Sequence, residues 1–232
     1  MGLQIGEIIS KKEISFSDLK GKTIAVDAFN AIYQFLTTIR QPDGTPLMDN
    51  RENITSHLSG LLYRNSNLLA EGIKLVYVFD GEYHELKGKT HEKRDTAKDQ
   101  AREKYEKAKD EEDIDAMGKY AKALGKLDDK MIEESKELLE SMGVAVVQAP
   151  SEGEAQTAYM VKRGDAYASV SQDYDNLIFS CPVLIRNLSI AGKRKNKGKF
   201  GYDSVKPDII SLQEVLDHLG LNLDQLIVMA IL

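Results

Sequence analysis

The chain has 232 residues and a mass of 25.9 kDa, of which 42% are hydrophobic and 29% charged, so it is expected to fold into one or two domains and is not disordered throughout. Its single cysteine, Cys181, excludes an intramolecular disulfide, and it has neither a signal-peptide pattern nor an apolar run near the roughly 20 residues of a membrane helix. We therefore expect a cytoplasmic or nuclear protein that does not associate with membranes, and the net charge of −6, taken alone, argues mildly against nucleic-acid binding.

Four short apolar runs rich in β-branched or small residues predict buried parallel strands, at 23–26, 75–79, 144–147 and 166–170. Helical patterns cover 28–39, 54–69, 131–142 and 152–161. Glycines that stand one to three residues before a strand, as helix C-caps do, are Gly72, Gly143 and Gly164. Alternating strands and helices of these lengths predict right-handed crossovers and a three-layer α/β fold with a mostly parallel sheet.

Two basic regions contrast with the acidic average. The stretch 83–129 is charged, helix-prone and poor in aliphatic residues, which predicts an exposed helical protrusion, and 87–109 holds nine basic against five acidic residues. The stretch 187–202 reads as a basic hairpin with five basic residues between Lys193 and Lys199. Residues 211–232 predict two helices that break at Gly220, and the apolar pattern continues to the last residue, as in a truncated chain.

Acidic residues follow each predicted strand at its carboxyl end. Asp27 and Asp80 end the first two strands, Glu152 and Glu154 follow the third, and Asp173 and Asp175 follow the fourth. Because the carboxyl ends of parallel strands form one edge of a sheet, we expect these six carboxylates to converge there. Their mutual repulsion would be strong at low dielectric, so the cluster predicts a bound cation.

Oxygen ligands without histidine or cysteine favour Mg²⁺ or Mn²⁺ over zinc. Two such ions about 4 Å apart are a known arrangement for phosphodiester cleavage. We expect direct ligation by Asp80, Glu152, Glu154, Asp173 and Asp175, and contact through water for Asp27.

Each acid also has a purely structural interpretation. Ser151 and Glu154 fit a capping box, Asp173 and Asp175 fit turn or N-cap positions, and Asp80 with Gly81 fits a plain turn. The presence of an acid at the same end of every predicted strand is what favours the metal site.

Eight short stretches carry a resemblance to a known family, and their order along the chain is that of the family. They are MGLQ (1–4), IAVDA (24–28), IYQFL (32–36), IRQ (39–41), TSHL (55–58), VYVFDG (76–81), PSEGEA (150–155) and SQDYD (171–175). In these stretches the chain resembles the archaeal-type flap structure-specific endonucleases of the 5′-nuclease superfamily, which have a PIN-like fold.

The resemblance implies a single nuclease domain over 1–232, with 83–129 as an inserted helical arch. It implies two-metal cleavage of branched DNA near a 5′ single-strand/duplex junction in replication and repair, with 5′–3′ exonuclease activity as well. The implied cofactor is two Mg²⁺ ions, replaceable by Mn²⁺, on the six acids. The implied catalytic residues are Lys87, Arg94, Asp27 and Asp80, the first two being cations at the base of the arch.

Implied DNA contacts are Gly2, Tyr33, Arg40, Arg64, Lys193, Arg194, Lys195 and Lys197. Tyr33 would stack on a base beside the cut, although it also fits helix packing among its apolar neighbours. Lys87 and Arg94 also fit a solvated helix face, and the 193–199 cluster also fits a nuclear-localisation tract or a solubility feature.

The family also has a further metal-site acid, a helix-hairpin-helix element and a C-terminal tail that binds the sliding clamp, and these 232 residues contain none of them. We therefore expect a weakened second metal site and poor duplex affinity. Separately, we expect a monomer. The alternatives are a relaxed 5′ exonuclease or an RNase of the same fold, and a DNA-binding scaffold with an incomplete metal site. A phosphoaspartyl phosphatase would need an aspartate where Phe29 stands.

Overall fold

The computed structural model describes residues 5–41, 44–82, 100, 104, 107, 127–188, 192–195 and 202–231, without the side chains of 192–195 and 202–204. It divides into two compact units. The first comprises Met1–Asn30, Asn65–Gly81 and Val144–Leu232, and the second comprises Ala31–Arg64 and Glu82–Gly143.

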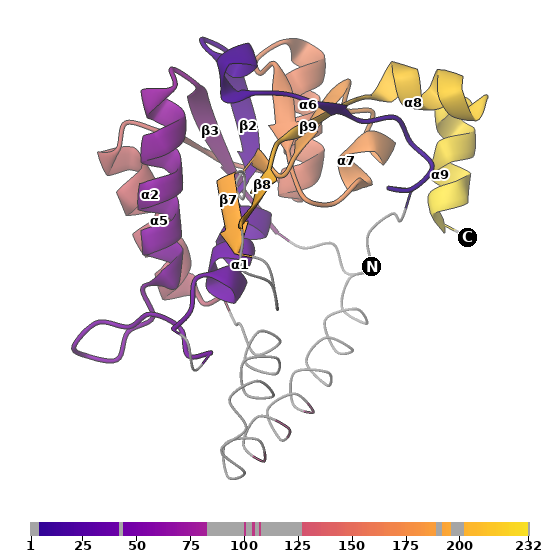
Figure 1. The fold of residues 1–232 in the computed structure, drawn as a ribbon. Helices are drawn as coiled ribbons and strands as arrows, with labels where there is room; N and C mark the ends of the chain where they lie inside the picture. Colours follow the sequence, from indigo (N-terminus) through magenta and orange to yellow (C-terminus); the bar gives the residue numbers. More distant parts are fainter. Residues whose placement is uncertain are drawn as a thin grey trace. The chain divides into compact units, whose positions relative to one another are not determined.

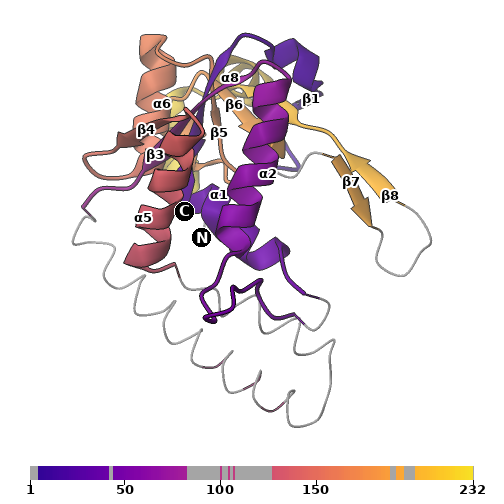
Figure 2. The ribbon, with the colours of Figure 1, turned by 90° about the vertical axis from the view of Figure 1, so that its left-hand side faces the viewer.

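The first unit is built on a seven-stranded sheet with the order β1-β9-β6-β5-β2-β3-β4. Figure 1 and Figure 2 show this sheet from two sides. The strands are β1 Lys12–Glu13, β2 Thr23–Asp27, β3 Lys74–Phe79, β4 Ala145–Gln148, β5 Ala168–Val170, β6 Val183–Arg186 and β9 Asp208–Ser211. All pairs from β4 to β6 are parallel, and β9 pairs antiparallel with both β6 and β1. The predicted α/β fold and its four parallel strands are confirmed, and β1, β6 and β9 are strands that the sequence patterns did not predict.

A separate two-stranded sheet pairs β7, Gly192–Lys195, antiparallel with β8, Tyr202–Val205 (Figure 2). These strands fall within or beside the stretch expected to form the basic hairpin. The expected arch at 83–129 lies almost wholly outside the described residues.

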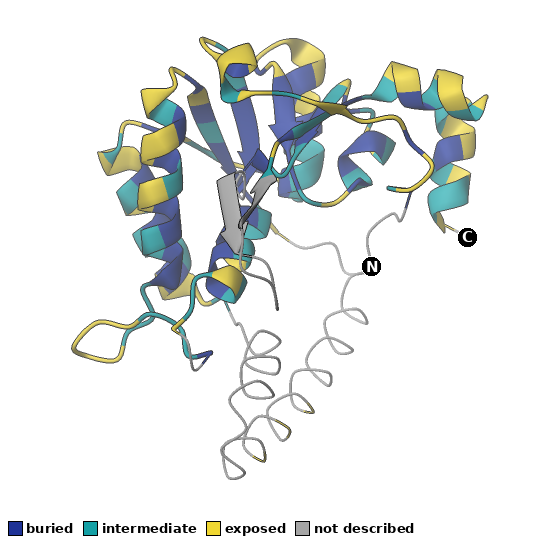
Figure 3. Ribbon diagram, in the orientation of Figure 1, coloured by how far each residue is buried: buried dark blue, intermediate teal, exposed yellow. Residues whose placement is uncertain are grey.

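The central strands are buried because they are nearly continuous apolar runs (Figure 3). Asp27 pairs with Val78, so β2 and β3 end at the same edge of the sheet. From β2 the chain proceeds outward to β3 and β4, and it resumes at β5 on the other side of β2. The carboxyl edge between β2 and β5 is therefore the topological switch point, where ligands bind in open α/β sheets.

The helices wholly within this unit pack on the sheet or beside it. Helix α6, Gly153–Arg163, contacts β2, β3 and β5. An apolar cluster joins the four-residue α7, Asp175–Ile178, to α8, Leu212–Leu219, and α9, Leu223–Ile231. Gly220 caps α8 in the left-handed conformation with φ of 64°, so the predicted break at this glycine is confirmed.

Helices α1, Ala28–Thr38, and α2, Ser56–Ala70, each begin in one unit and end in the other. In the second unit, a Cβ at Gly60 would lie 2.3 Å from Phe35 Cγ, so these helices approach closely only because residue 60 is glycine. Helix α5, Asp129–Ser141, begins where the Asp128 side chain accepts a hydrogen bond from the Met131 amide at 2.8 Å. In the described part of the chain, no helix is long and apolar enough to cross a membrane.

Candidate metal centre at the carboxyl edge of the sheet

Asp27 is the last residue of β2 and is only 5% exposed. Its Oδ1 accepts a hydrogen bond from the backbone N–H of Asn30 at 3.1 Å. The first turn of α1 thus holds this carboxylate at the end of the strand, as an N-cap residue is held.

Asp80 follows β3 and lies against the start of α6. Its Oδ1 accepts a hydrogen bond from the Gly153 backbone N–H at 2.6 Å. A Cβ at residue 153 would lie 2.7 Å from that same oxygen and 3.2 Å from Val78 O, so only glycine allows this approach. The Asp80–Gly81 pair is therefore more than a plain turn, because its carboxylate is tied to a helix 73 residues away.

Glu152 is the N-cap residue of α6, and its side chain makes no capping hydrogen bond. The helix begins at Gly153, one residue after the expected start, and its N-cap is Glu152, so the capping box from Ser151 to Glu154 is not formed. The physical reason is that the Ser151 carbonyl accepts from the Gly81 N–H at 2.6 Å, which ties residue 151 to the turn after β3. Glu154 Oε1 accepts instead from Ser171 Oγ at 3.1 Å.

Asp173 and Asp175 lie on the segment that follows β5. Asp173 Oδ2 accepts from Asn30 Nδ2 at 3.1 Å, and the Asp173 N–H donates to Ser171 Oγ at 3.1 Å. Asp175 is the first residue of α7, whose N-cap position is occupied by Tyr174. Neither aspartate is an N-cap, and the carboxylate of Asp173 is held by a residue 143 positions away.

Five of the six acids are coupled electrostatically. Burial raises the pKa of Asp27 to about 7. The hydrogen bond from the Asn30 N–H lowers this pKa, and repulsion from Asp80 and Asp173 raises it further. Burial also raises the pKa of Glu154 to about 8, with repulsion from Asp27, Asp175 and Asp173 adding to it. The neighbouring charges that raise both values are carboxylates, so the cluster concentrates negative charge that a cation would neutralise.

The chemistry of these donors fits Mg²⁺ or Mn²⁺ because all of them are carboxylate oxygens. Among the described residues, however, no group of three or more histidine, cysteine, aspartate or glutamate side chains is placed so that together they could hold a metal ion. A closed cage is not what magnesium requires, since it commonly binds through one or two carboxylates and keeps several waters. The carboxylates therefore fit an open site in which a bound ion keeps some of its waters.

A buried polar network, absent from the sequence predictions, lies under the acids. The Asn176 side chain is fully buried, and its Nδ2 lies 3.0 Å from Glu154 O, 2.9 Å from Thr157 Oγ1 and 3.1 Å from Ser169 Oγ. These contacts tie α7 to α6 and β5. In the sequence, Asn176 is only a polar residue directly after Asp175. Its position there fits a solvent-exposed turn equally well, so the sequence does not predict its burial.

Arg186, the last residue of β6, holds the segment that carries Asp173. Its Nε donates to Gln172 O at 2.9 Å, its guanidinium carbon lies 4.1 Å from the centre of the Tyr174 ring, and its Nη1 donates to the Tyr174 hydroxyl. Arg186 therefore holds Gln172 and Tyr174, the residues on either side of Asp173, and so restrains the backbone that carries Asp173.

The expected DNA contacts are only partly within the described residues. In the second unit, Tyr33 is 37% exposed on α1, Arg40 Nη1 donates to Gly44 O at 2.8 Å, and Arg64 is half-buried on α2. The backbone of Lys193, Arg194 and Lys195 forms β7. The side chains of those three residues, together with Gly2, Lys87, Arg94 and Lys197, lie outside the described residues.

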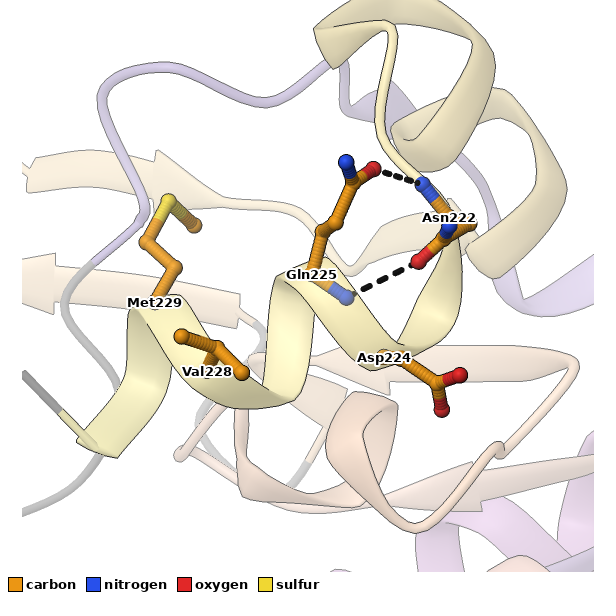
Figure 4. Close-up of a pocket in the computed structure, with 5 residues that line it drawn as sticks. All are labelled: Asn222, Asp224, Gln225, Val228 and Met229. Atoms are coloured by element: carbon orange, nitrogen blue, oxygen red, sulfur yellow. Dashed lines mark hydrogen bonds between the residues drawn. The ribbon is translucent and has the colours of Figure 1, made fainter.

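A groove on α9 has a different character from the acidic edge (Figure 4). It is lined by Asn222, Asp224, Gln225, Val228 and Met229, and Asp224 is the one carboxylate in this lining. Asn222 and Gln225 exchange two hydrogen bonds of 2.9 Å, each from a backbone N–H to the other's side-chain oxygen. These bonds cap the start of α9, so the polar groups there serve the helix.

Two family models and several known proteins match this chain. Residues 2–101 match the XPG N-terminal domain, and residues 143–232 match the XPG I-region. Flap endonuclease 1 of Pyrococcus furiosus is 56% identical over 232 residues, which are 100% of this chain and 68% of that protein. Flap endonuclease 1 of Staphylothermus marinus is 52% identical over 236 residues, covering 100% of this chain and 67% of that protein.

Solved structures show the same fold. Flap endonuclease-1 from Methanococcus jannaschii has a TM-score of 0.72 and 44% identity, over 97% of this chain and 68% of that one. The catalytic core of Rad2 in complex with DNA substrate has a TM-score of 0.66 and 25% identity, over 98% of this chain and 60% of that one.

Proposed function

This chain belongs to the flap endonuclease family of XPG-type nucleases, and from that premise we propose that it hydrolyses a phosphodiester of branched DNA at the base of a 5′ flap. Nucleases of this family depend on metal ions, generally Mg²⁺. The similarity to proteins named flap endonuclease favours this function over a relaxed exonuclease, an RNase or an inactive scaffold.

The observation that carries the proposal is the coupled carboxylate cluster at the switch point of the sheet. Burial and mutual repulsion raise the pKa of Asp27 and Glu154 toward neutrality. Such perturbed acids at the ligand-binding edge of an α/β sheet are typical of a functional site. A merely structural set of aspartates would have local turn or capping partners, whereas Asp80 and Asp173 have partners from distant segments.

Two divalent ions bound here would supply a water nucleophile at neutral pH and neutralise charge on the phosphate. We assign direct contact with the ions to Asp80, Glu152, Glu154, Asp173 and Asp175, and contact through water to Asp27. The protein holds these carboxylate oxygens in position through hydrogen bonds. The Gly153 N–H orients Asp80, and Ser171 orients Glu154.

The remaining assignments rest on the family. Lys87 and Arg94 would place positive charge on the scissile phosphate, and Tyr33 would stack on a neighbouring base. Gly2, Arg40, Arg64 and the basic residues at 193–197 would contact the DNA backbone. We regard 1–232 as one nuclease domain with an arch at 83–129 and a basic hairpin at 187–202, acting as a monomer in the cytoplasm of an archaeal-type cell.

Cleavage of a 5′-labelled flap substrate with Mg²⁺ tests the function. We expect a cut near the junction, and faster cleavage of the flap than of a nicked duplex or a single-stranded RNA. Asp175→Ala should lose turnover and still bind the flap. Asp165→Ala is the matched control, because Asp165 is exposed and paired with Arg163 at 3.2 Å, and it should keep full activity. Cleavage that persists unchanged in EDTA would refute the proposal.

A further inference from the structure

Asn30 connects the two sides of the switch point. It lies in the first turn of α1, three residues after Asp27, and its backbone N–H donates to Asp27 Oδ1 at 3.1 Å. Its side-chain Nδ2 donates to Asp173 Oδ2 at 3.1 Å, and its Oδ1 accepts from the Gln172 backbone N–H at 3.3 Å. One residue thus touches the acid that ends β2 and both the backbone and the acid of the segment after β5.

The two acids that Asn30 contacts, Asp27 and Asp173, differ in how firmly the rest of the fold holds their carboxylates. Asp27 is buried and sits on a strand, so its position is fixed by the sheet. Asp173 is exposed and follows β5 by three residues, so its carboxylate has rotational freedom unless a neighbour restrains it. The two hydrogen bonds of the Asn30 side-chain amide, to Asp173 Oδ2 and to the Gln172 N–H, provide that restraint.

The amide is also chemically suited to this place. A lysine or arginine that held Asp173 would neutralise it and compete with a metal ion for the same carboxylate. A neutral amide donates one hydrogen bond and leaves the negative charge and the second carboxylate oxygen available. The orientation of a ligand carboxylate by a neutral hydrogen-bond donor is the usual role of the outer shell of a metal site.

We propose that Asn30 is a positioning residue that fixes the carboxylate of Asp173 relative to Asp27 and thereby sets the affinity of the site for a divalent ion. The inference rests on the proposed function, because it assumes that Asp173 contacts the ion. Asn30 itself need not touch the ion or the DNA.

Binding of Mn²⁺ to the protein without DNA, followed by electron paramagnetic resonance, tests this role. Asn30→Leu keeps the number and branching of the side-chain heavy atoms and removes both side-chain hydrogen bonds. It should weaken Mn²⁺ binding by about 10-fold, the lower end of the range for outer-shell substitutions. Asn67→Leu, on the exposed face of α2, is the control and should bind Mn²⁺ as the wild type does. Affinity for flap DNA in EDTA should stay within about twofold in both variants.

A double-mutant cycle separates positioning from a general effect on folding. In an Asp173→Ala background, Asn30→Leu should cause no further loss of Mn²⁺ affinity, because the residue through which it acts is gone. If Asn30→Leu proves unfolded by circular dichroism, Asn30→Ser, a smaller change at this half-buried site, takes its place in the same cycle.

Wild-type Mn²⁺ affinity in the Asn30 variant, or an equal loss with and without Asp173, would overturn the positioning role while leaving the proposed function intact. A wild-type protein that neither binds Mn²⁺ nor cuts the flap would instead refute the proposed function and the positioning role together.

Discussion

Protons and divalent ions compete for Asp27 and Glu154, so metal binding should depend steeply on pH. With a pKa of about 7 for Asp27 and about 8 for Glu154, both carboxyls are mostly protonated at pH 6 in the metal-free protein. An ion that requires both carboxylates must displace these protons, whereas at pH 8 Asp27 is ionised and Glu154 is about half ionised.

The expected size of the effect follows from the two pKa values. Between pH 8 and pH 6 the ionised fraction of Glu154 falls about 50-fold and that of Asp27 about 10-fold, so the apparent affinity should fall by roughly 10² to 10³. The sign is fixed, because acidification adds protons to ligands that bind metal only when deprotonated.

Titration of Mn²⁺ at pH 6, 7 and 8, without DNA, measures this dependence. Glu154→Gln removes the more basic of the two groups, so its affinity should change only about 10-fold over the same interval. Glu140→Gln, an exposed residue of α5, should keep the full dependence of the wild type. An affinity that changes less than about threefold between pH 8 and pH 6 in the wild type would refute the argument that these two buried acids face the ion.

Three further outcomes follow from the same geometry. In the folded, metal-free protein Asp27 and Glu154 stay protonated well above about pH 4.5, where the unfolded chain has already released these protons. The melting temperature should therefore fall as pH rises from 5 to 8. A melting temperature that calorimetry finds independent of pH would contradict this. Gly153→Ala, which forces a Cβ to within 2.7 Å of Asp80 Oδ1, should lower kcat on the flap by about 10-fold or more, and unchanged turnover would show that Asp80 is not held there. Asn176→Leu, which removes the buried contacts to Glu154, Thr157 and Ser169, should lower the free energy of unfolding in urea by about 1–3 kcal/mol, and a loss below about 0.5 kcal/mol would contradict it.

The parts of the fold that the sequence predicts are those with strong local periodicity. The strands at the centre of the sheet are apolar and buried on both sides, so their positions are evident without any knowledge of their partners. The acids at their ends follow from topology, because parallel strands share a carboxyl edge. The helix boundaries agree to within two residues for α1, α2, α5 and α6.

Local patterns could not predict the rest because it depends on pairing between distant segments. Strands β1, β6 and β9 lie on one side of the sheet, and they form by pairing with one another or with β5. The start of α6 is set by a hydrogen bond between Gly81 and Ser151, which are 70 positions apart. The contact of Asn30 with Asp173 spans 143 positions. Polar residues of this kind look like ordinary helix or turn residues until the fold brings them together.

Anomalous diffraction from a crystal soaked in Mn²⁺ tests most directly whether the carboxyl edge of the sheet is a metal centre. We predict peaks within ligand distance of oxygens from Asp80, Glu154, Asp173 or Asp175, and their loss in an Asp173→Ala, Asp175→Ala double variant. Peaks found only elsewhere on the protein, or a carboxyl edge that stays empty at saturating Mn²⁺ and pH 8, would contradict the assignment of these acids to phosphodiester cleavage.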